Sequence, residues 1–445
     1  MAASVFDSAH LARLFPTAEV GRLFTDGAEL RAMLLTEGML AKAQGELGVI
    51  PKDSAGAIQR AAMEIHLDPG ALAQATGANG VSVPALVAAF RTEMQAPEHA
   101  QYVHWGATSQ DILDTGLMLR LRQAVSVVER DLVQILTALA GLAETHADLP
   151  MAARTYGQHA TPTSFGALVA AWGEPLINLL GELPELRRAC LVVSLSGAAG
   201  TSSALGPKAA KARAALARLL NLGDPGRSWH TDRTPVLRLA DWFTRVGLAL
   251  GKMGEDLTEL TQTGIGEISL GLGGSSSTMP QKQNPVGPAV MVALARQGAG
   301  LLAVLHGAAM HRHQRDGAAW FTEWMCLPQI VLGAAAAAQT AVGLSEGLKP
   351  DAKAMADALT GGLDLIHAEA LSFALAGLMP RPEAQARTKA LCKEAADTGT
   401  PLKQMIARDW PQLDAAALTD PAQQMGRAAD EARAFAARVR DLTLE

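Results

Sequence analysis

Aromatic residues, cysteines and charged side chains are all scarce in this chain of 445 residues. Aromatic residues make up 4% of it and charged residues 18%, whereas hydrophobic residues account for 49%. Such a hydrophobic content excludes a disordered chain, and the length suggests two to four domains, or one long helical body with smaller ends. The net charge of −6, with both signs interspersed, argues against non-specific nucleic-acid binding, which requires basic patches.

The few cysteines and the lack of long apolar runs exclude further classes. Cys190, Cys326 and Cys392 lie far apart without a CxxC pair, which predicts reduced thiols in a cytoplasm and neither a disulfide framework nor a zinc site. The start of the chain, Met1–Leu14, lacks a basic segment followed by an apolar one, so no signal peptide is expected. The most apolar stretch, Val331–Leu344, is too short for a membrane span and is expected to be a buried helix.

Strand signals are nearly absent, and helical periodicity is strong in the middle of the chain. Apolar residues recur at steps of three and four from Leu113 to Leu142, a seam of about 30 residues or about 45 Å. A second seam runs from Leu239 to Leu260, and further helices are expected over 163–195, 288–309 and 327–346. Abundant alanine and glycine allow helices to approach closely. These features predict an all-α protein with a long central helical bundle.

Breaks in the periodicity divide the chain into three predicted helical domains. Polar, turn-rich segments at His99–Gly106 and Leu348–Asp351 suggest an N-terminal domain over 1–105, a central bundle over 106–349 and a C-terminal domain over 350–445. The seams are longer than one small domain can bury. We therefore expect the bundle to pack on copies of itself in an oligomer, with a monomeric bundle as the alternative.

Two polar segments precede long helices. His104–Asp111 lies before the first seam, and Thr108 or Ser109 can cap that helix, whose free N–H groups could bind a substrate carboxylate. A plain capped helix explains the same residues. Arg154–Thr163 gathers arginine, glutamine and histidine ahead of another helix, and here a site and a helix that starts at a proline remain equally open.

Two further polar segments interrupt the bundle. Gly271–Pro285 has a flexible glycine- and serine-rich half, followed by a half in which prolines stiffen the chain around Lys282 and Asn284, which indicates a lid more than a linker. His311–Trp320 contains two histidines at a spacing that does not suit zinc. Arg315 in that segment is a candidate anion anchor, although a solvated basic turn is the simpler interpretation.

Taken together, the first three of these segments resemble the signature regions of the fumarase/aspartase superfamily. The Ser276–Pro285 stretch, with Met-Pro-Gln-Lys-Gln-Asn-Pro at its end, is similar to the superfamily signature and is quite specific. Gly106–Asp111 resembles the first conserved region and Arg154–Pro162 the second, while Gln44–Pro51 and Ala368–Leu371 extend the resemblance over nearly the whole chain. The resemblance implies a three-domain helical subunit and a homotetramer. Each active site would then combine loops of three subunits, without a metal or organic cofactor.

Within the superfamily, the His104–Asp111 and Trp320–Trp324 strings resemble the lactone-forming cycloisomerase branch. The implied reaction is ring closure of a tricarboxylate, 3-carboxy-cis,cis-muconate, in aromatic catabolism from protocatechuate. Amine-eliminating members carry histidine where this chain has Tyr156 and glutamate where it has Ala289, which argues against an adenylosuccinate lyase-type reaction that releases fumarate. A 3-sulfomuconate cycloisomerase and a non-catalytic scaffold remain as alternatives.

The resemblance also implies roles for individual residues. The acid/base that serves the substrate carbon would be Ser276, with Ser277 as the substitute, and Lys282 would complete the catalytic group. The expected substrate-binding residues lie in four segments: His104, Thr108, Ser109, Gln158, His159, Asn284 and Arg315. Among them, Thr108, Ser109 and Asn284 would act with Lys282 on developing negative charge, and the role of His159 is left open.

Overall fold

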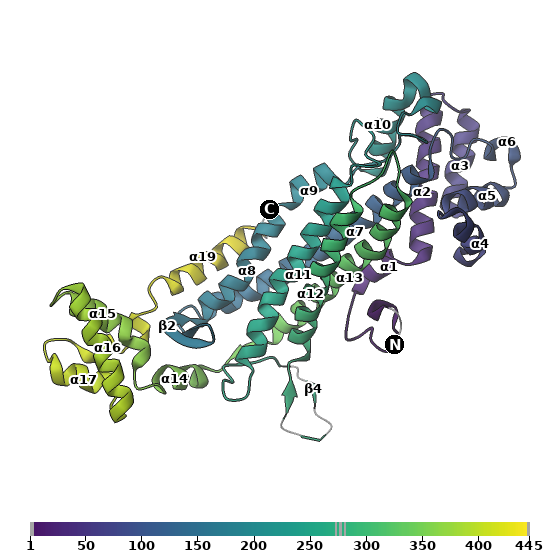
Figure 1. Cartoon of the computed structure of the whole chain (residues 1–445). Coiled ribbons are helices and arrows are strands. Elements are labelled where there is room, and N and C mark those ends of the chain that lie inside the picture. Colours follow the sequence, from purple (N-terminus) through teal and green to yellow (C-terminus); the bar gives the residue numbers. More distant parts are fainter. Residues whose placement is uncertain (1–3, 272–273, 276–277, 280–281, 443–445) are drawn as a thin grey trace. The chain divides into compact units, whose positions relative to one another are not determined.

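The protein is built almost entirely of helices, as a computed structural model shows for residues 4–271, 274–275, 278–279 and 282–442 (Figure 1). Strands in these residues form only three antiparallel pairs: β1 with β2, β3 with β6, and β4 with β5. The predicted all-α class is therefore confirmed. Where the sequence carries its 3.6-residue apolar period, the helix forms because that period places one apolar face toward neighbouring helices.

Four long helices account for most of the predicted bundle. Their bounds are Ser109–Thr145 for α7, Thr234–Leu260 for α11, Val286–Ala308 for α12 and Gly317–Gly347 for α13. The first two contain the two apolar seams, and residues of both seams such as Leu121, Leu139, Leu239 and Leu257 are fully buried. The periodicity therefore located the two seam helices and α12, whereas α13 begins ten residues before the expected start at residue 327.

The helix expected over 163–195 is wrong in detail. The structure has α8 at Phe165–Gly181 and α9 at Leu183–Cys190, separated at Glu182. Pro175 lies inside α8 and does not end it. Pro184 falls in the first turn of α9, where a missing backbone N–H costs nothing because that group has no helical partner.

The chain divides into two compact units that interleave along the sequence. The first contains Met1–Asp131, Leu179–Leu248 and Ala293–Gln339, and the second contains Leu132–Asn178, Ala249–Val292 and Thr340–Glu445. The division into three domains in chain order remains a prediction.

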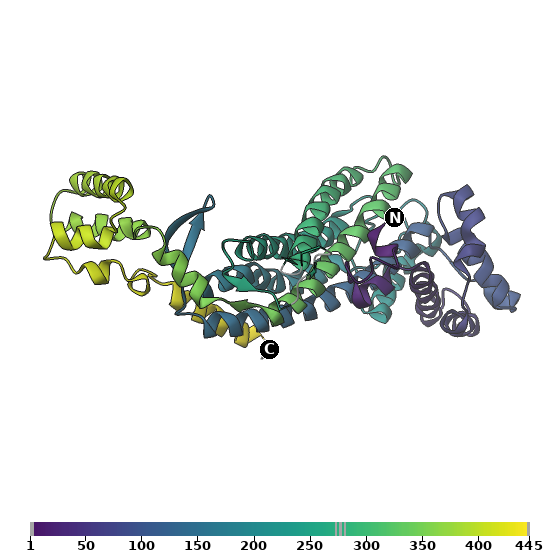
Figure 2. The ribbon, with the colours of Figure 1, turned by 90° about the horizontal axis from the view of Figure 1, so that it is seen from below.

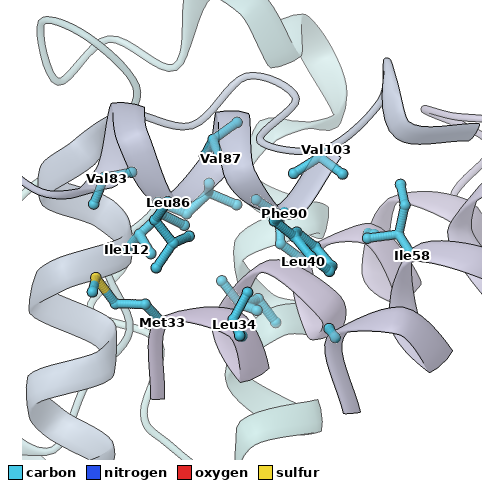
Figure 3. Packing of buried hydrophobic residues seen from close by; sticks show 14 of the residues in the cluster. Met33, Leu34, Leu40, Ile58, Val83, Leu86, Val87, Phe90, Val103 and Ile112 are labelled. Atoms are coloured by element: carbon cyan, nitrogen blue, oxygen red, sulfur yellow. The ribbon is translucent and has the colours of Figure 1, made fainter. Parts of the chain in front are cut away.

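The first unit has a core built from short helices around the start of α7. Besides the long helices and α9, its elements are η1 (Val5–Asp7), α1 (Ala18–Leu23), α2 (Asp26–Glu46), α3 (Lys52–Glu64), α4 (Pro69–Asn79), α5 (Val83–Glu93), α6 (Pro97–Ala100), η2 (Ser203–Lys208) and α10 (Ala209–Leu220). Figure 3 shows Met33 and Leu40 of α2, Leu86 and Phe90 of α5, and Ile112 of α7 packed together. This core anchors both α2 and the first turns of α7.

The second unit combines a β-hairpin with the C-terminal helices. Its elements are β1 (Pro150–Thr155), β2 (Gln158–Ser164), β3 (Ile268–Ser269), β4 (Gly274–Ser275), β5 (Gln283–Asn284), β6 (Lys349–Pro350), α14 (Ala352–Thr360), η3 (Leu365–His367), α15 (Ala368–Ala376), α16 (Arg381–Thr398), α17 (Leu402–Asp409), α18 (Ala415–Leu418), η4 (Pro421–Gln423) and α19 (Ala428–Leu442). Helices α15, α16 and α17 form a cluster of their own, with Leu371, Leu391 and Ile406 fully buried (Figures 1 and 2).

Two helices, α12 and α13, are long and apolar enough to cross a membrane by length and composition alone. In α13 the most apolar window is 61% buried within the protein, which is typical of a core helix. The stretch expected to be a buried helix, Val331–Leu344, lies in α13, and Val331, Ala336 and Ala341 in it are fully buried.

Candidate active site

The first turn of α7 is organised around Asp111, a completely buried carboxylate. Its Oδ1 accepts hydrogen bonds from the Ser194 hydroxyl and the Ser196 amide, both at 2.9 Å, and lies 2.8 Å from His230 Nε2. Its Oδ2 accepts from the amides of Gly197 at 2.9 Å and Thr108 at 3.1 Å. Asp111 thus occupies the Thr108 amide, which is not available to an anion.

A second chain of hydrogen bonds links Thr108 to Arg315. The buried Gln110 donates to the His230 carbonyl at 2.8 Å and accepts at 2.9 Å from Arg315 Nε. Arg315 Nη2 also approaches Thr108 Oγ1 at 3.4 Å and the Ala198 carbonyl at 3.3 Å. The guanidinium is therefore held over the start of α7, where it adds positive charge beside a hydroxyl. These contacts tie Arg315 to the start of α7, and its role as an anion anchor remains a prediction.

His104 lies at the entrance to the same loop and has a left-handed backbone, with φ of +65°. Its Nδ1 is 2.6 Å from Oε1 of Glu37, a buried residue of α2. Burial by itself lowers the pKa of His104, but the charge of Glu37, the hydrogen bond to it and the charge of Asp111 outweigh burial and raise that pKa. The ring is therefore biased toward the imidazolium form, which can bind a carboxylate.

A buried ion triad lies one turn further along α7, at Asp114. Arg233 donates to Asp114 at 2.8 and 2.9 Å and to Glu323 at 2.9 and 2.7 Å, and each side chain is at most 2% exposed. Burial alone would lower the pKa of Arg233, yet the two carboxylates reverse that effect and raise it. Its guanidinium also stacks 4.9 Å from the Trp229 ring. The Trp320–Trp324 segment thus contributes Glu323 to the structural frame of the site.

A pocket of about 500 Å³ lies beside this triad in the first unit. Asp114, Glu323, Trp320 and Arg120 are among its lining residues, together with apolar side chains of α2 and α4. None of the site residues predicted from the sequence lines this pocket. The predicted residues of the first unit lie instead at the hydrogen-bonded start of α7.

In the second unit, the Arg154–Thr163 segment forms a hairpin and not the start of a helix. Strands β1 and β2 pair antiparallel, and the turn residues Tyr156 and Gly157 both have positive φ, +53° and +71°, as a type I′ turn requires. Gln158 and His159 are exposed near this turn, and Tyr156 is fully exposed. Arg154, in contrast, makes a two-pronged ion pair with the buried Glu267 at 2.7 Å, which is a structural role.

The predicted lid also contains a hairpin. Gly274 pairs with Asn284 and Ser275 with Gln283, so the two halves of the loop run antiparallel. Lys282 is exposed and Asn284 half-buried. The catalytic candidates Ser276 and Ser277 lie outside the described residues.

The structure therefore brings one group of predicted residues together. His104, Thr108, Ser109 and Arg315 all lie at or beside the start of α7 in the first unit, and their use in binding a carboxylate remains a prediction. The other described residues of the prediction belong to two hairpins of the second unit: Gln158, His159, Lys282 and Asn284. Within the described ranges, no group of three or more His, Cys, Asp or Glu side chains is placed to hold a metal ion.

Three residues that organise the site were not among those predicted. Asp111 was noted only as a residue of the first turn, and neither Glu37 nor His230 was singled out. The available signal was a pair of acidic residues, Asp111 and Asp114, spaced to lie on one side of a helix that is otherwise apolar there. Buried acidic residues need partners, so this spacing could have indicated a network.

The fold and this site define a class of protein: the chain belongs to the lyase family whose sequence model matches residues 16–300. A 3-carboxy-cis,cis-muconate cycloisomerase of Pseudomonas aeruginosa is 39% identical over 427 residues, which cover 93% of each chain. A nitrosuccinate lyase of Streptomyces davaonensis is 36% identical and covers 96% of this chain and 94% of its own. Among solved structures, a 3-carboxy-cis,cis-muconate lactonizing enzyme of Pseudomonas putida aligns with a TM-score of 0.90 at 35% identity, over 98% of this chain and all of its own.

Proposed function

We propose that this protein is a cycloisomerase that closes 3-carboxy-cis,cis-muconate to a carboxymuconolactone. The observation that carries this proposal is the similarity over 93% of both chains to a cycloisomerase of that name, reinforced by a solved lactonizing enzyme at a TM-score of 0.90. The substrate is a small tricarboxylate. It matches the cationic and hydroxyl groups that gather at the start of α7.

The reaction rearranges bonds within one molecule and needs no co-substrate. An oxygen of one substrate carboxylate forms a C–O bond to the β carbon of a conjugated double bond. The π electrons of that bond move onto the carboxylate attached to the α carbon and give an aci-carboxylate. A proton then adds to the α carbon, the electrons return and the γ-lactone remains. Stabilising the charge of this intermediate is the main catalytic task.

The predicted residues divide into two roles in this reaction. In the first unit, His104 and Arg315 bind substrate carboxylates, while the hydroxyls of Thr108 and Ser109 donate hydrogen bonds to developing charge. Lys282 and Asn284 of the signature loop add a positive charge and an amide donor. Gln158 of the hairpin contributes a further hydrogen bond, and His159 lies beside it.

The attacking carboxylate explains why a tyrosine can stand at position 156. Its pKa is about 4, so it is already ionised at neutral pH and needs no base. In the reverse direction it leaves without a proton, unlike an amine. One acid/base, which serves the carbon, is then sufficient, and Ser276 is the proposed group.

We also infer a homotetramer whose active sites are shared between subunits, acting in the cytoplasm. Supporting observations are the exposed apolar side chains on the long helices of the first unit, among them Leu248, Val304 and Met325, which are 46%, 51% and 62% exposed. Apolar side chains left exposed on long helices are available for packing against another copy of the chain. The full exposure of the Tyr156 turn fits a hairpin that reaches into a neighbouring subunit. Light scattering tests the assembly, and a monomer of full activity would refute it.

An ultraviolet assay tests the reaction directly. The purified protein is added to 3-carboxy-cis,cis-muconate and the loss of conjugated-diene absorbance is followed, with adenylosuccinate and 3-sulfomuconate as parallel substrates. Rapid loss with the carboxymuconate alone is the expected result. Fumarate release from adenylosuccinate without diene loss would refute the proposal.

The acid/base assignment is tested with Ser276→Ala and its neighbour Ser277→Ala as the matched control. We expect Ser276→Ala to lower kcat by at least about 100-fold with a modest change in KM, because loss of a general acid/base typically costs that much. Near-normal turnover of Ser276→Ala would exclude this serine. A large loss in Ser277→Ala alone would transfer the role to it.

A further inference from the structure

A buried glutamate, Glu37, lies directly behind His104. Its side chain is 0% exposed in the middle of α2, and its Oε1 is 2.6 Å from His104 Nδ1. Its Oε2 is also buried and has no hydrogen-bond partner in the part of the chain that the structure describes. A carboxylate is costly to bury without a counter-charge, so His104 is the group that compensates Glu37.

Charged groups from three helices face the His104 ring. Glu37 belongs to α2, Asp111 to α7 and Arg91 to α5, and only Arg91 opposes protonation of the ring. Arg91 is engaged elsewhere, since its Nη2 donates to the Val103 carbonyl at 2.8 Å. The two carboxylates thus act together on an imidazole that is 20% exposed.

We propose that Glu37 is a positioning residue of this active site. Glu37 holds the His104 ring through Nδ1–H and keeps the ring protonated, so that Nε2–H faces a substrate carboxylate as a charged donor. A neutral histidine without Glu37 could adopt either tautomer, and one of them would present a lone pair to the anion. The ion pair selects the donor form. The inference deepens the proposed function and depends on it for the identity of the anion.

The backbone turn that carries His104 is also held by α2. His104 has φ of +65°, and Gly106 two residues later has φ of +72°, so the backbone turns sharply before Thr108. Another residue of α2, Gln44, holds this turn from one side, because its Nε2 donates to the Trp105 carbonyl at 2.6 Å. Helix α2 therefore supports the loop through one neutral contact and one charged contact.

These two contacts provide a test variant and a matched control. Glu37→Gln keeps the shape and leaves an oxygen that can accept from Nδ1–H, but it removes the charge. Gln44→Leu removes a buried hydrogen bond from the same helix to the neighbouring residue and alters no charge. Glu37→Asp restores the charge on a shorter side chain.

The first readout does not require turnover. Hydrogen–deuterium exchange at the imidazole C2 position, followed across pH by mass spectrometry, reports the pKa of His104 in the whole protein. We expect a pKa above the ordinary value of about 6.5 in the wild type and in Gln44→Leu, and a lower one in Glu37→Gln. A wild-type pKa at or below the ordinary value would overturn the inference even if Glu37→Gln does not fold.

The second readout is the pH profile of lactonisation. In Glu37→Gln we expect kcat/KM near pH 8 to fall by about 10- to 100-fold, mainly through KM, which corresponds to loss of one charged hydrogen bond to the substrate. Lowering the pH should restore activity, because His104 then protonates unaided, and Glu37→Asp should recover part of it at pH 8. A loss that is independent of pH, or equal in Gln44→Leu, would assign Glu37 a merely structural role. Absence of turnover in the wild type would instead refute the proposed function and leave the exchange result valid.

Discussion

Replacing Asp111 with asparagine is expected to destabilise the first unit and to weaken the site together. Asparagine can leave its oxygen where Oδ1 accepts from Ser194, Ser196 and His230. Its NH₂ group then faces the amides of Gly197 and Thr108, which are donors themselves. Two hydrogen bonds to a charged acceptor are lost, at about 1.5–3 kcal/mol each, so the free energy of unfolding falls by about 3–6 kcal/mol.

Thermal melting and the lactonisation assay measure both effects. For a folding unit of the size of the first unit, Tm shifts by about 2–4 °C per kcal/mol, so it should fall by roughly 6–24 °C. Asp131→Asn is the control on the same helix, because Asp131 is also buried but has only a long contact of 3.4 Å from the exposed Arg130 and one short hydrogen bond from a neutral donor, Gln339, at 2.6 Å. An asparagine oxygen can keep that bond, so a loss below about 1.5 kcal/mol is expected. If Asp111→Asn were as stable as wild type, or Asp131→Asn as damaging, the assigned role of Asp111 would be wrong.

Three further predictions concern pH, backbone strain and thiol chemistry. The pKa of His104 is raised in the folded state, so its pairing with Glu37 stabilises the fold fully below pH of about 6.5, and this stabilisation is lost as the pH rises through the raised pKa. The difference in free energy of unfolding between wild type and Glu37→Gln, measured by urea titration, should therefore narrow with rising pH. A difference that stays constant with pH would contradict this. Tyr156→Asn should raise the free energy of unfolding by about 0.5–1 kcal/mol in calorimetry, since asparagine adopts the positive φ of the turn more readily, and a drop would speak against the turn geometry. Burial raises the pKa of Cys190 to about 11 and also raises the pKa of the half-buried Cys392. A thiol reagent at pH 8 should therefore modify Cys392 first and Cys190 only on unfolding. Fast labelling of Cys190 in the native protein would refute its burial.

The long helices could be predicted because their signal is local. The seam from Leu113 to Leu142 repeats every three to four residues, and such a pattern buries a continuous face only as a helix. The result is α7, which begins at Ser109 as the capping residues indicate. The Arg154–Thr163 segment was harder, since its pairing depends on a two-residue turn in which Tyr156 takes an unfavourable φ. The sequence therefore left only a site or a helix that starts at a proline open here, and the hairpin was not expected.

The sequence by itself determined the helical class, the position of the main helices and the signature residues that point to the family. Only the tertiary structure decided the partners of the buried charges. Asp111 meets His230 from 119 residues away, and Glu37 meets His104 from 67 residues away. Arg154, which looked as suited to a site as its neighbours, pairs with Glu267 instead. A periodic pattern reports which face of a helix is buried, but the charge that compensates a buried carboxylate is set by the packing of segments far apart in the chain, which no local pattern records.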